Sequence, residues 1–227
     1  MLEEAAAQLG ELLDELVLVG GCAAGLLVTD PGSSPIRPTE DVDLVVEATT
    51  YIDYQRFGKR LANRGFKPGT TPGDPLCRWR GNNLTLDIMP LDEAVLGFSN
   101  QWYQSALEAP SQTRLPSGTL LSHIDAPHFL ATKLNAFQSR GEGDFLTSAD
   151  LEDVVVVIDG RPTIRQELQA SGALLQSYVA EQLRALLAER HFLEALPGYF
   201  LGESHAGQRS RSLMETLRHL ARAEQDS

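Results

Sequence analysis

The chain has 227 residues, enough for one large domain or two small ones. Its 42% hydrophobic, 22% charged and 7% aromatic residues are the proportions of a water-soluble globular protein, and they exclude a disordered, collagen-like or disulfide-rich chain. Acidic residues outnumber basic ones by 31 to 19, and the net charge of -12 repels polyanions, so a nucleic-acid partner requires a local basic patch.

Cysteine use and the N-terminal residues favour a cytoplasmic protein. Cys22 and Cys77 have neither the spacing of a zinc site nor that of a disulfide framework, which favours a reducing compartment. The first residues are acidic, whereas a secretory leader begins with positive charge, and no run reaches the about 18 apolar residues of a membrane span. We therefore expect a cytoplasmic protein with no membrane partner.

The first half of the chain alternates between strand and helix patterns. The expected elements are an amphipathic helix over 2–16, a strand over 17–19, a turn at Gly20-Gly21, a helix over 22–27, a proline-rich loop over 30–38, a strand over 39–47 and a helix over 53–63. Two strands over 76–80 and 84–89 follow, and Gly81-Asn82-Asn83 is a plausible hairpin turn between them. These elements predict a mixed sheet covered by helices.

The second half is mainly helical. A strand is expected near Leu120, and a helix is expected to begin after Pro127. The run Val154–Ile158 has strand propensity, but the capping box that begins at Thr147 favours a helix through residue 158. Residues 165–193 and 211–222 are predicted as the closing helices. The sequence thus predicts an α+β fold, with a first domain over 1–116 and a mainly helical domain over 117–227.

Acidic residues are the first candidate site. Asp41 and Asp43 are two residues apart on a predicted strand, so both carboxylates project from one face, and such oxygen ligands suit Mg²⁺ or Mn²⁺. Asp87 stands inside an otherwise apolar strand, where it can supply a third carboxylate that takes a proton from an attacking hydroxyl. Paired acids at a solvated strand end, and a lone acid capping a strand, are the alternative interpretations.

Glycine and lysine motifs point to a phosphate ligand. Gly20 and Gly21 lie at a strand-to-helix turn, where backbone N–H groups can approach a phosphate closely. Lys133 and Arg140 lie along one side of a predicted helix, and a lysine beside a triphosphate can neutralise charge during transfer. The alternatives are an ordinary tight turn and a solvated helix lysine.

Taken together, these motifs resemble a known family. The series Gly20-Gly21, Arg37-x-Thr39-x-Asp41-x-Asp43 and Asp87, followed by Lys133-x-x-Ala136-x-x-x-Arg140 and Asp150-x-x-Asp153, resembles nucleotidyltransferases of the DNA polymerase β superfamily, in particular the AbiEii-like (MenA-type) toxin branch. The resemblance spans about residues 16–158. It implies the nucleotidyltransferase fold in the first domain and a cytoplasmic enzyme of a toxin–antitoxin pair.

The resemblance also assigns a role to each motif. It implies that Asp41, Asp43 and Asp87 are catalytic and hold Mg²⁺ or Mn²⁺, with Asp87 as general base. The nucleotide-binding residues that it implies are Gly20, Gly21, Arg37, Thr39, Lys133 and Asp153. The expected reaction is an in-line attack by an acceptor hydroxyl on the α-phosphorus of a nucleoside triphosphate, with release of pyrophosphate.

The acceptor stays open at this point. The toxin resemblance favours RNA, such as a tRNA 3′ end, and a protein antitoxin as partner. Four arginines near the C-terminus can supply the basic patch, or can be ordinary solvated helix residues: Arg209, Arg211, Arg218 and Arg222. An acidic cleft also suits a cationic antibiotic such as an aminoglycoside. A catalytically silent nucleotide-binding module is the alternative outside the enzymes.

Overall fold

The computed structural model describes residues 1–141, 143–200 and 206–222. Contacts divide the chain into two units, of which the first contains Met1–Leu26 and Arg37–Asp125 and the second contains Leu27–Ile36 and Ala126–Ser227. The sequence places the domain boundary near residue 116, whereas the contact division follows Asp125. The reason for this difference is that two further strands before Asp125 pair with the sheet of the first unit.

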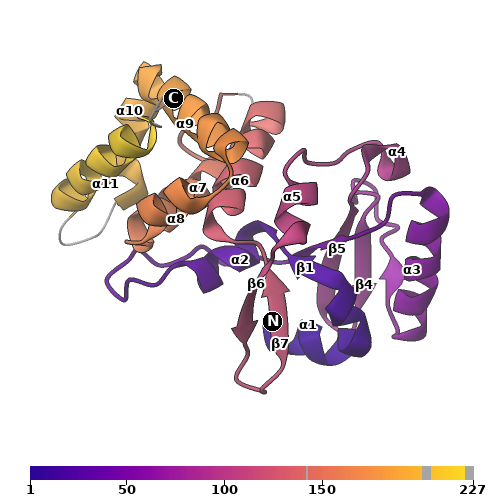
Figure 1. Ribbon diagram of the computed structural model, residues 1–227. Coiled ribbons are helices and arrows are strands. Elements are labelled where there is room, and N and C mark those ends of the chain that lie inside the picture. Colours follow the sequence, from indigo (N-terminus) through magenta and orange to yellow (C-terminus); the bar gives the residue numbers. More distant parts are fainter. Residues whose placement is uncertain (142, 201–205, 223–227) are drawn as a thin grey trace. The chain divides into compact units, whose positions relative to one another are not determined.

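A mixed seven-stranded sheet forms the centre of the first unit within the described residues, and Figure 1 labels most of its strands. The strand order is β3-β4-β5-β2-β1-β7-β6. The strands are β1 (Leu16–Leu18), β2 (Val42–Val46), β3 (Lys67–Pro68), β4 (Arg78–Gly81), β5 (Leu84–Pro90), β6 (Ser111–Arg114) and β7 (Leu120–His123). β2 pairs with β5 in parallel, as β1 does with β7, and the other pairs are antiparallel. The α+β fold with a mixed sheet is therefore confirmed.

Short helices accompany this sheet. They are α1 (Leu2–Leu9), the 3₁₀ helix η1 (Gly10–Glu15), α2 (Gly20–Leu27), α3 (Tyr51–Asn63), α4 (Glu93–Leu96) and α5 (Tyr103–Glu108). The prediction of one helix over 2–16 is wrong, because Gly10 has φ +55°, which ends α1 and starts the 3₁₀ turn. The α3 helix begins two residues before the predicted start at residue 53, because the Thr50 side chain caps it by accepting a hydrogen bond from the Asp53 N–H.

The second unit is helical in its described residues. Its elements are α6 (Ala126–Arg140), α7 (Ala149–Gly160), α8 (Ile164–Ala170), α9 (Ala173–Ala188), α10 (Arg190–Ala195), the 3₁₀ helix η2 (Leu196–Phe200) and α11 (Ala206–Leu220). The valine run lies in α7, so the helix prediction there is confirmed. The residue that caps α7 is Ser148, which accepts a hydrogen bond from the Leu151 N–H, because the hydroxyl of Thr147 is bound to Asp144 instead.

The proline-rich segment 27–36 belongs to the second unit. The N–H groups of Thr29 and Asp30 both donate to the carbonyl oxygen of Gly160, each at 2.9 Å. Arg161 also donates to the carbonyl oxygen of Leu27 at 2.6 Å. These bonds fix the segment to the C-terminal end of α7. Among the described helices, none has both the length and the apolar character needed to cross a membrane.

Candidate functional site

A row of charged residues crosses three neighbouring strands of the sheet. Asp43 on β2 is paired with Asp87 on β5, and Asp87 is paired with Arg78 on β4. Paired residues on adjacent strands project from the same face of a sheet, so these side chains are direct neighbours. Asp41 lies two residues before Asp43, and its side chain is 31% exposed. Strand register therefore brings Asp43 and Asp87 together, and Asp41 lies just before the strand that carries Asp43.

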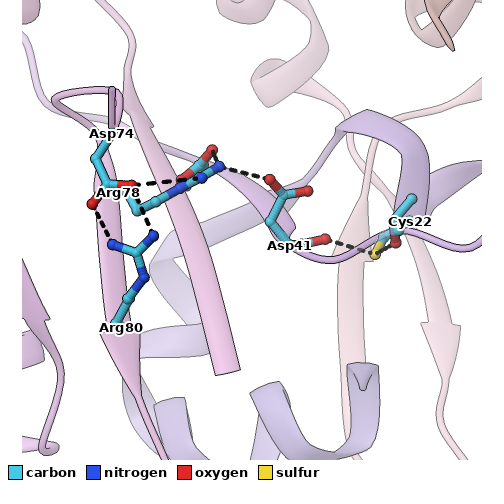
Figure 2. Close-up of polar contacts among 7 residues, drawn as sticks. Cys22, Asp41, Asp74, Arg78 and Arg80 are labelled. Carbon is cyan, nitrogen blue, oxygen red and sulfur yellow. Dashed lines mark hydrogen bonds and ion pairs between the residues drawn. The ribbon is translucent and has the colours of Figure 1, made fainter. Parts of the chain in front are cut away.

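Arg78 joins two of these aspartates. Its Nε donates to Asp87 Oδ1 at 2.8 Å, and its Nη2 donates both to Asp87 Oδ2 at 2.7 Å and to Asp41 Oδ2 at 2.8 Å. Figure 2 shows the Arg78 guanidinium reaching Asp41. The hydrogen bonds that Arg78 donates to Asp87, together with the charges of Asp87 and Asp41, hold the pKa of Arg78 above its usual range. The two carboxylates thus converge on one cationic nitrogen.

Arg78 was not among the residues predicted from the sequence, although the hairpin contains a signal for it. Asn82 and Asn83 have φ values of +29° and +66°, which identifies them as the two central residues of the turn. A two-residue turn at these positions pairs residue 81 with 84, and hence Arg78 with Asp87, as observed. An arginine opposite an acid in an apolar strand explains how that acid is tolerated at 10% side-chain exposure.

A second ion pair supports the outer side of this row. Arg80 Nη2 donates to Asp74 Oδ1 at 2.7 Å (Figure 2). Asp74 Oδ2 also accepts a hydrogen bond from the Thr71 N–H at 2.9 Å. The hydrogen bond from Arg80 lowers the pKa of Asp74 to about 2. Asp74 Oδ1 is also 3.9 Å from Arg78 Nη1. Asp74, which was not predicted from the sequence, therefore lies on the side of Arg78 opposite to Asp41 (Figure 2).

Gly20 is required where the first turn of α2 meets Asp43. Its φ of +64° is left-handed, and a Cβ at this position would lie only 2.5 Å from the Cβ and the Cγ of Asp43. The neighbouring Val19 N–H donates to the carbonyl oxygen of Asp43 at 2.9 Å. Gly21 is the next residue of α2 and is buried. Close packing on Asp43 accounts for the glycine at position 20, and its role as a phosphate seat stays a prediction.

Thr39 lies beside the same helix. Its hydroxyl is 2.9 Å from Cys22 Sγ, and Cys22 Sγ donates to the carbonyl oxygen of Asp41 at 3.2 Å. Figure 2 shows this contact between Cys22 and the backbone at Asp41. Burial raises the pKa of the Cys22 thiol, which keeps it protonated and able to donate. Arg37, the first residue of the returning first-unit segment, is half-buried.

The predicted residues Lys133 and Asp153 lie in a buried ion cluster of the second unit. Lys133 Nζ is 2.6 Å from Asp153 Oδ2 and 3.2 Å from Asp150 Oδ1, and the Lys133 side chain is only 9% exposed. Arg140 donates to both oxygens of Asp150 at 3.0 Å. Burial acts to raise the pKa of Asp150, but the hydrogen bond from Arg140 and the charge of Lys133 lower it overall. The charge of Lys133 is thus balanced inside its own unit.

The predicted C-terminal arginines are divided between two environments. Arg209 forms an ion pair with Asp159, donates to the carbonyl oxygen of Gly32 at 2.7 Å and lies 5.3 Å from the centre of the Phe200 ring. Arg211, Arg218 and Arg222 are exposed. Arg209 therefore contributes to packing within the second unit, and the other three remain candidates for a basic patch.

The comparisons leave the family open. Neither the models of known protein families nor the curated proteins give a match to this chain. Within the part of the chain that the structure describes, no three His, Cys, Asp or Glu side chains form a ready-made metal site. At the aspartate row, the guanidinium of Arg78 stands between Asp41 and Asp87, where it already supplies a cation.

Proposed function

We propose that the first unit is the catalytic part of a nucleotidyltransferase, which transfers a nucleoside monophosphate from a nucleoside triphosphate to an acceptor hydroxyl. The observation that carries this proposal is the convergence of Asp41, Asp43 and Asp87 beside the glycine that opens α2. Because positions 41 and 87 share a single cationic partner, the side chains are close enough to act on one ligand. Helix N-termini next to such acids are suited to phosphate groups.

The donor set fits a hard divalent cation. Mg²⁺ and Mn²⁺ prefer carboxylate oxygens, and the residues that would hold the ion are Asp41, Asp43 and Asp87. The affinity of this cluster for positive charge is evident from the three hydrogen bonds that Arg78 donates to it. When bound, the ion would neutralise the negative charge that develops on the phosphate oxygens.

The chain's own residues have separate tasks in this proposal. Gly20 permits the first N–H groups of α2 to approach the phosphates, since a side chain there would collide with Asp43. Asp87 accepts the proton of the acceptor hydroxyl. The acceptor oxygen forms a bond to the α-phosphorus while the bond from the α-phosphorus to the bridging oxygen breaks, and pyrophosphate leaves with that electron pair.

The remaining parts of the proposal concern the acceptor and the setting. We propose RNA, such as a tRNA 3′ end, with Arg211, Arg218 and Arg222 as phosphate contacts, because these exposed arginines stand out against the net charge of -12. A cytoplasmic toxin with a protein antitoxin follows from the motif resemblance. The second candidate is a catalytically silent nucleotide-binding module, which is favoured by the engagement of both Asp87 oxygens with Arg78.

The test is label transfer from α-³²P-labelled nucleoside triphosphates. Each of the four nucleotides is incubated with Mg²⁺ or Mn²⁺ and either total RNA or an aminoglycoside panel, and the labelled product identifies the acceptor. We expect labelled RNA, and a loss of at least about 100-fold in the Asp43→Asn variant, since Asp43 would hold the ion that neutralises the phosphate charge, and removing one charge-stabilising group typically costs this much rate. Glu15→Gln is the matched control, because Glu15 is an exposed acid of the same unit that pairs with Arg60 and has no part in the proposed ligand set.

Two results would contradict the enzyme proposal. Full transfer by Asp43→Asn would remove the aspartate row from the reaction. Metal-dependent nucleotide binding by calorimetry, with no transfer to RNA or to an aminoglycoside, would favour the silent module instead.

A further inference from the structure

We propose that Arg78 is an internal counter-cation that competes with a divalent metal ion for the aspartate row, and that metal binding requires its release from Asp41 and Asp87. This inference rests on the proposed function, because it assumes that these aspartates hold a metal ion. It adds a residue that neither the sequence motifs nor the resemblance includes. Arg78 would set how strongly the site binds metal.

The competition follows from the hydrogen-bonding atoms. Arg78 binds both carboxylate oxygens of Asp87 and one of Asp41, through two nitrogens. A metal ion that uses Asp87 and Asp41 together would need oxygens that now accept hydrogen bonds from the guanidinium. An arginine cannot give way by losing a proton, since its pKa is far above physiological pH and the acids raise it further. The guanidinium therefore has to move.

The surroundings of Arg78 provide a place for it to move to. Asp74 Oδ1 lies 3.9 Å from Arg78 Nη1, just beyond a direct hydrogen bond. Asp74 is on the side of Arg78 away from the aspartate row, and it already binds Arg80. The Arg78 side chain is 21% exposed, so its tip is not locked in a closed core. A rotation toward Asp74 would exchange two carboxylate partners for one.

The charges of the three aspartates predict how the stability of the metal-free protein depends on Arg78. Without Arg78, the carboxylates of Asp41, Asp43 and Asp87 would face one another with no cation between them, which destabilises the fold. Such a variant should bind metal more tightly and gain more stability from it, because a ligand that binds only the folded state stabilises it by mass action. In the metal-free wild type, by contrast, Arg78 already neutralises part of the negative charge of these aspartates.

The test compares Mn²⁺ binding to the wild type, Arg78→Gln and Arg80→Gln by isothermal titration calorimetry. Arg80 is the matched control because it lies on the same strand and binds Asp74, while its described contacts include neither Asp41 nor Asp87. We expect Arg78→Gln to bind Mn²⁺ about tenfold more tightly than the wild type, equivalent to about 1.4 kcal/mol, and Arg80→Gln to bind like the wild type. In EDTA, Arg78→Gln should have the lower melting temperature, and Mn²⁺ should raise that temperature more than in the wild type.

The outcomes separate this inference from the function on which it rests. Equal or weaker Mn²⁺ binding by folded Arg78→Gln, with binding by the wild type, would overturn the competition and leave the metal-dependent function standing. If none of the three proteins binds Mn²⁺, both the inference and the metal requirement of the proposed reaction are overturned.

A second measurement uses the wild type, in case Arg78→Gln does not fold. The Nε–H of Arg78 donates to Asp87, so it should give a distinct signal in protein labelled with ¹⁵N-arginine, assigned by its loss in Arg78→Lys. We expect this signal to shift and its exchange with water to accelerate as Mg²⁺ is added. A signal that is unchanged at saturating Mg²⁺ would overturn the inference.

Discussion

Replacement of Gly20 by alanine tests how closely α2 must approach the aspartate row. The substitution adds one methyl group at a residue with φ +64°, next to the side chain of Asp43. Two effects oppose it. The left-handed backbone is unfavourable for a residue with a Cβ, and the new methyl group would overlap the Cβ and the Cγ of Asp43, each 2.5 Å away.

The expected loss of stability can be worked from these two effects. Left-handed backbone strain in a residue with a Cβ is worth about 1–2 kcal/mol. Forcing a methyl group into a filled site adds about 1–3 kcal/mol, because Asp43 is on a strand that is paired on both sides and can shift little. We therefore expect Gly20→Ala to lower the free energy of unfolding by about 2–5 kcal/mol.

A urea titration followed by tryptophan fluorescence measures this loss in the first unit, which contains Gly20. The chain has two tryptophans, Trp79 and Trp102, and both belong to the first unit. Gly25→Ala is the control, because Gly25 lies exposed in the same helix α2, where alanine should stabilise by about 0.5–1 kcal/mol. A loss below about 1 kcal/mol in Gly20→Ala would refute the argument for close packing.

A double variant tests whether Asp43 is the residue that the new methyl group at position 20 overlaps. Asp43→Ala removes the Cγ and the carboxylate oxygens but keeps the Cβ, so it relieves only part of the overlap with the new methyl group. We expect the loss caused by Gly20→Ala to be smaller by about 0.5–3 kcal/mol in the Asp43→Ala background. Additive losses would show that the strain at position 20 has no connection with Asp43.

Two further predictions concern the ion cluster of the second unit, where far-UV circular dichroism follows helix unfolding. Lys133→Met removes the ammonium group that lies 2.6 Å from the buried Asp153 carboxylate. The free energy of unfolding should therefore fall by about 3–5 kcal/mol, because an unpaired charge remains buried. A loss below about 1 kcal/mol would contradict the burial of this pair. The folded-state pKa of Asp150 is below its unfolded value of about 3.9, so the stability that it contributes is present above this pH and is lost as pH falls through the folded pKa. Asp150→Asn should therefore lower stability at pH 7 and flatten its decline below about pH 4, and an unchanged acid limb of the stability curve would contradict the assignment.

Local sequence patterns were sufficient for α3, α7 and one hairpin, whereas the single helix predicted over 165–193 is divided into α8, α9 and α10. The Thr50 cap and the apolar spacing after it define α3, and Ser148 together with the acids that follow it starts α7 in spite of its valines. The turn at Asn82 and Asn83 defines the β4–β5 hairpin. Each of these signals involves residues that are close in the chain, where propensity and capping act directly.

Features that depend on distant partners were harder to predict. β6 is a short polar run that becomes a strand because it pairs with β7, and β3 consists of two residues held by β4. The proline-rich segment 27–36 gives no local sign that it is anchored by Gly160. The boundary near residue 116 depended on a break in local composition, whereas the contact division depends on the pairing of β7 with β1.

In the candidate site, too, the residue types could be predicted from the sequence, whereas contacts between distant residues could not. The identities of Asp41, Asp43 and Asp87 could be inferred from motif chemistry, and their convergence depends on the parallel pairing of β2 with β5. The partner of the acids, Arg78, was missed because charge pairing across a hairpin becomes visible only once the register is counted. Lys133 was expected at a phosphate, and the structure gives it Asp150 and Asp153 as partners within its unit.

The anchoring of residues 27–36 has a consequence for how the protein is made. Leu27 and Arg161, which are joined by a hydrogen bond, are 134 positions apart in the chain. On the ribosome, the early segment therefore emerges long before α7 has been translated, and its backbone groups remain solvated until that helix arrives. Domains generally fold in order as they are synthesised, but residues 27–36 interrupt the first unit in the chain and cannot form their bonds to Gly160 and Arg161 until α7 has been made.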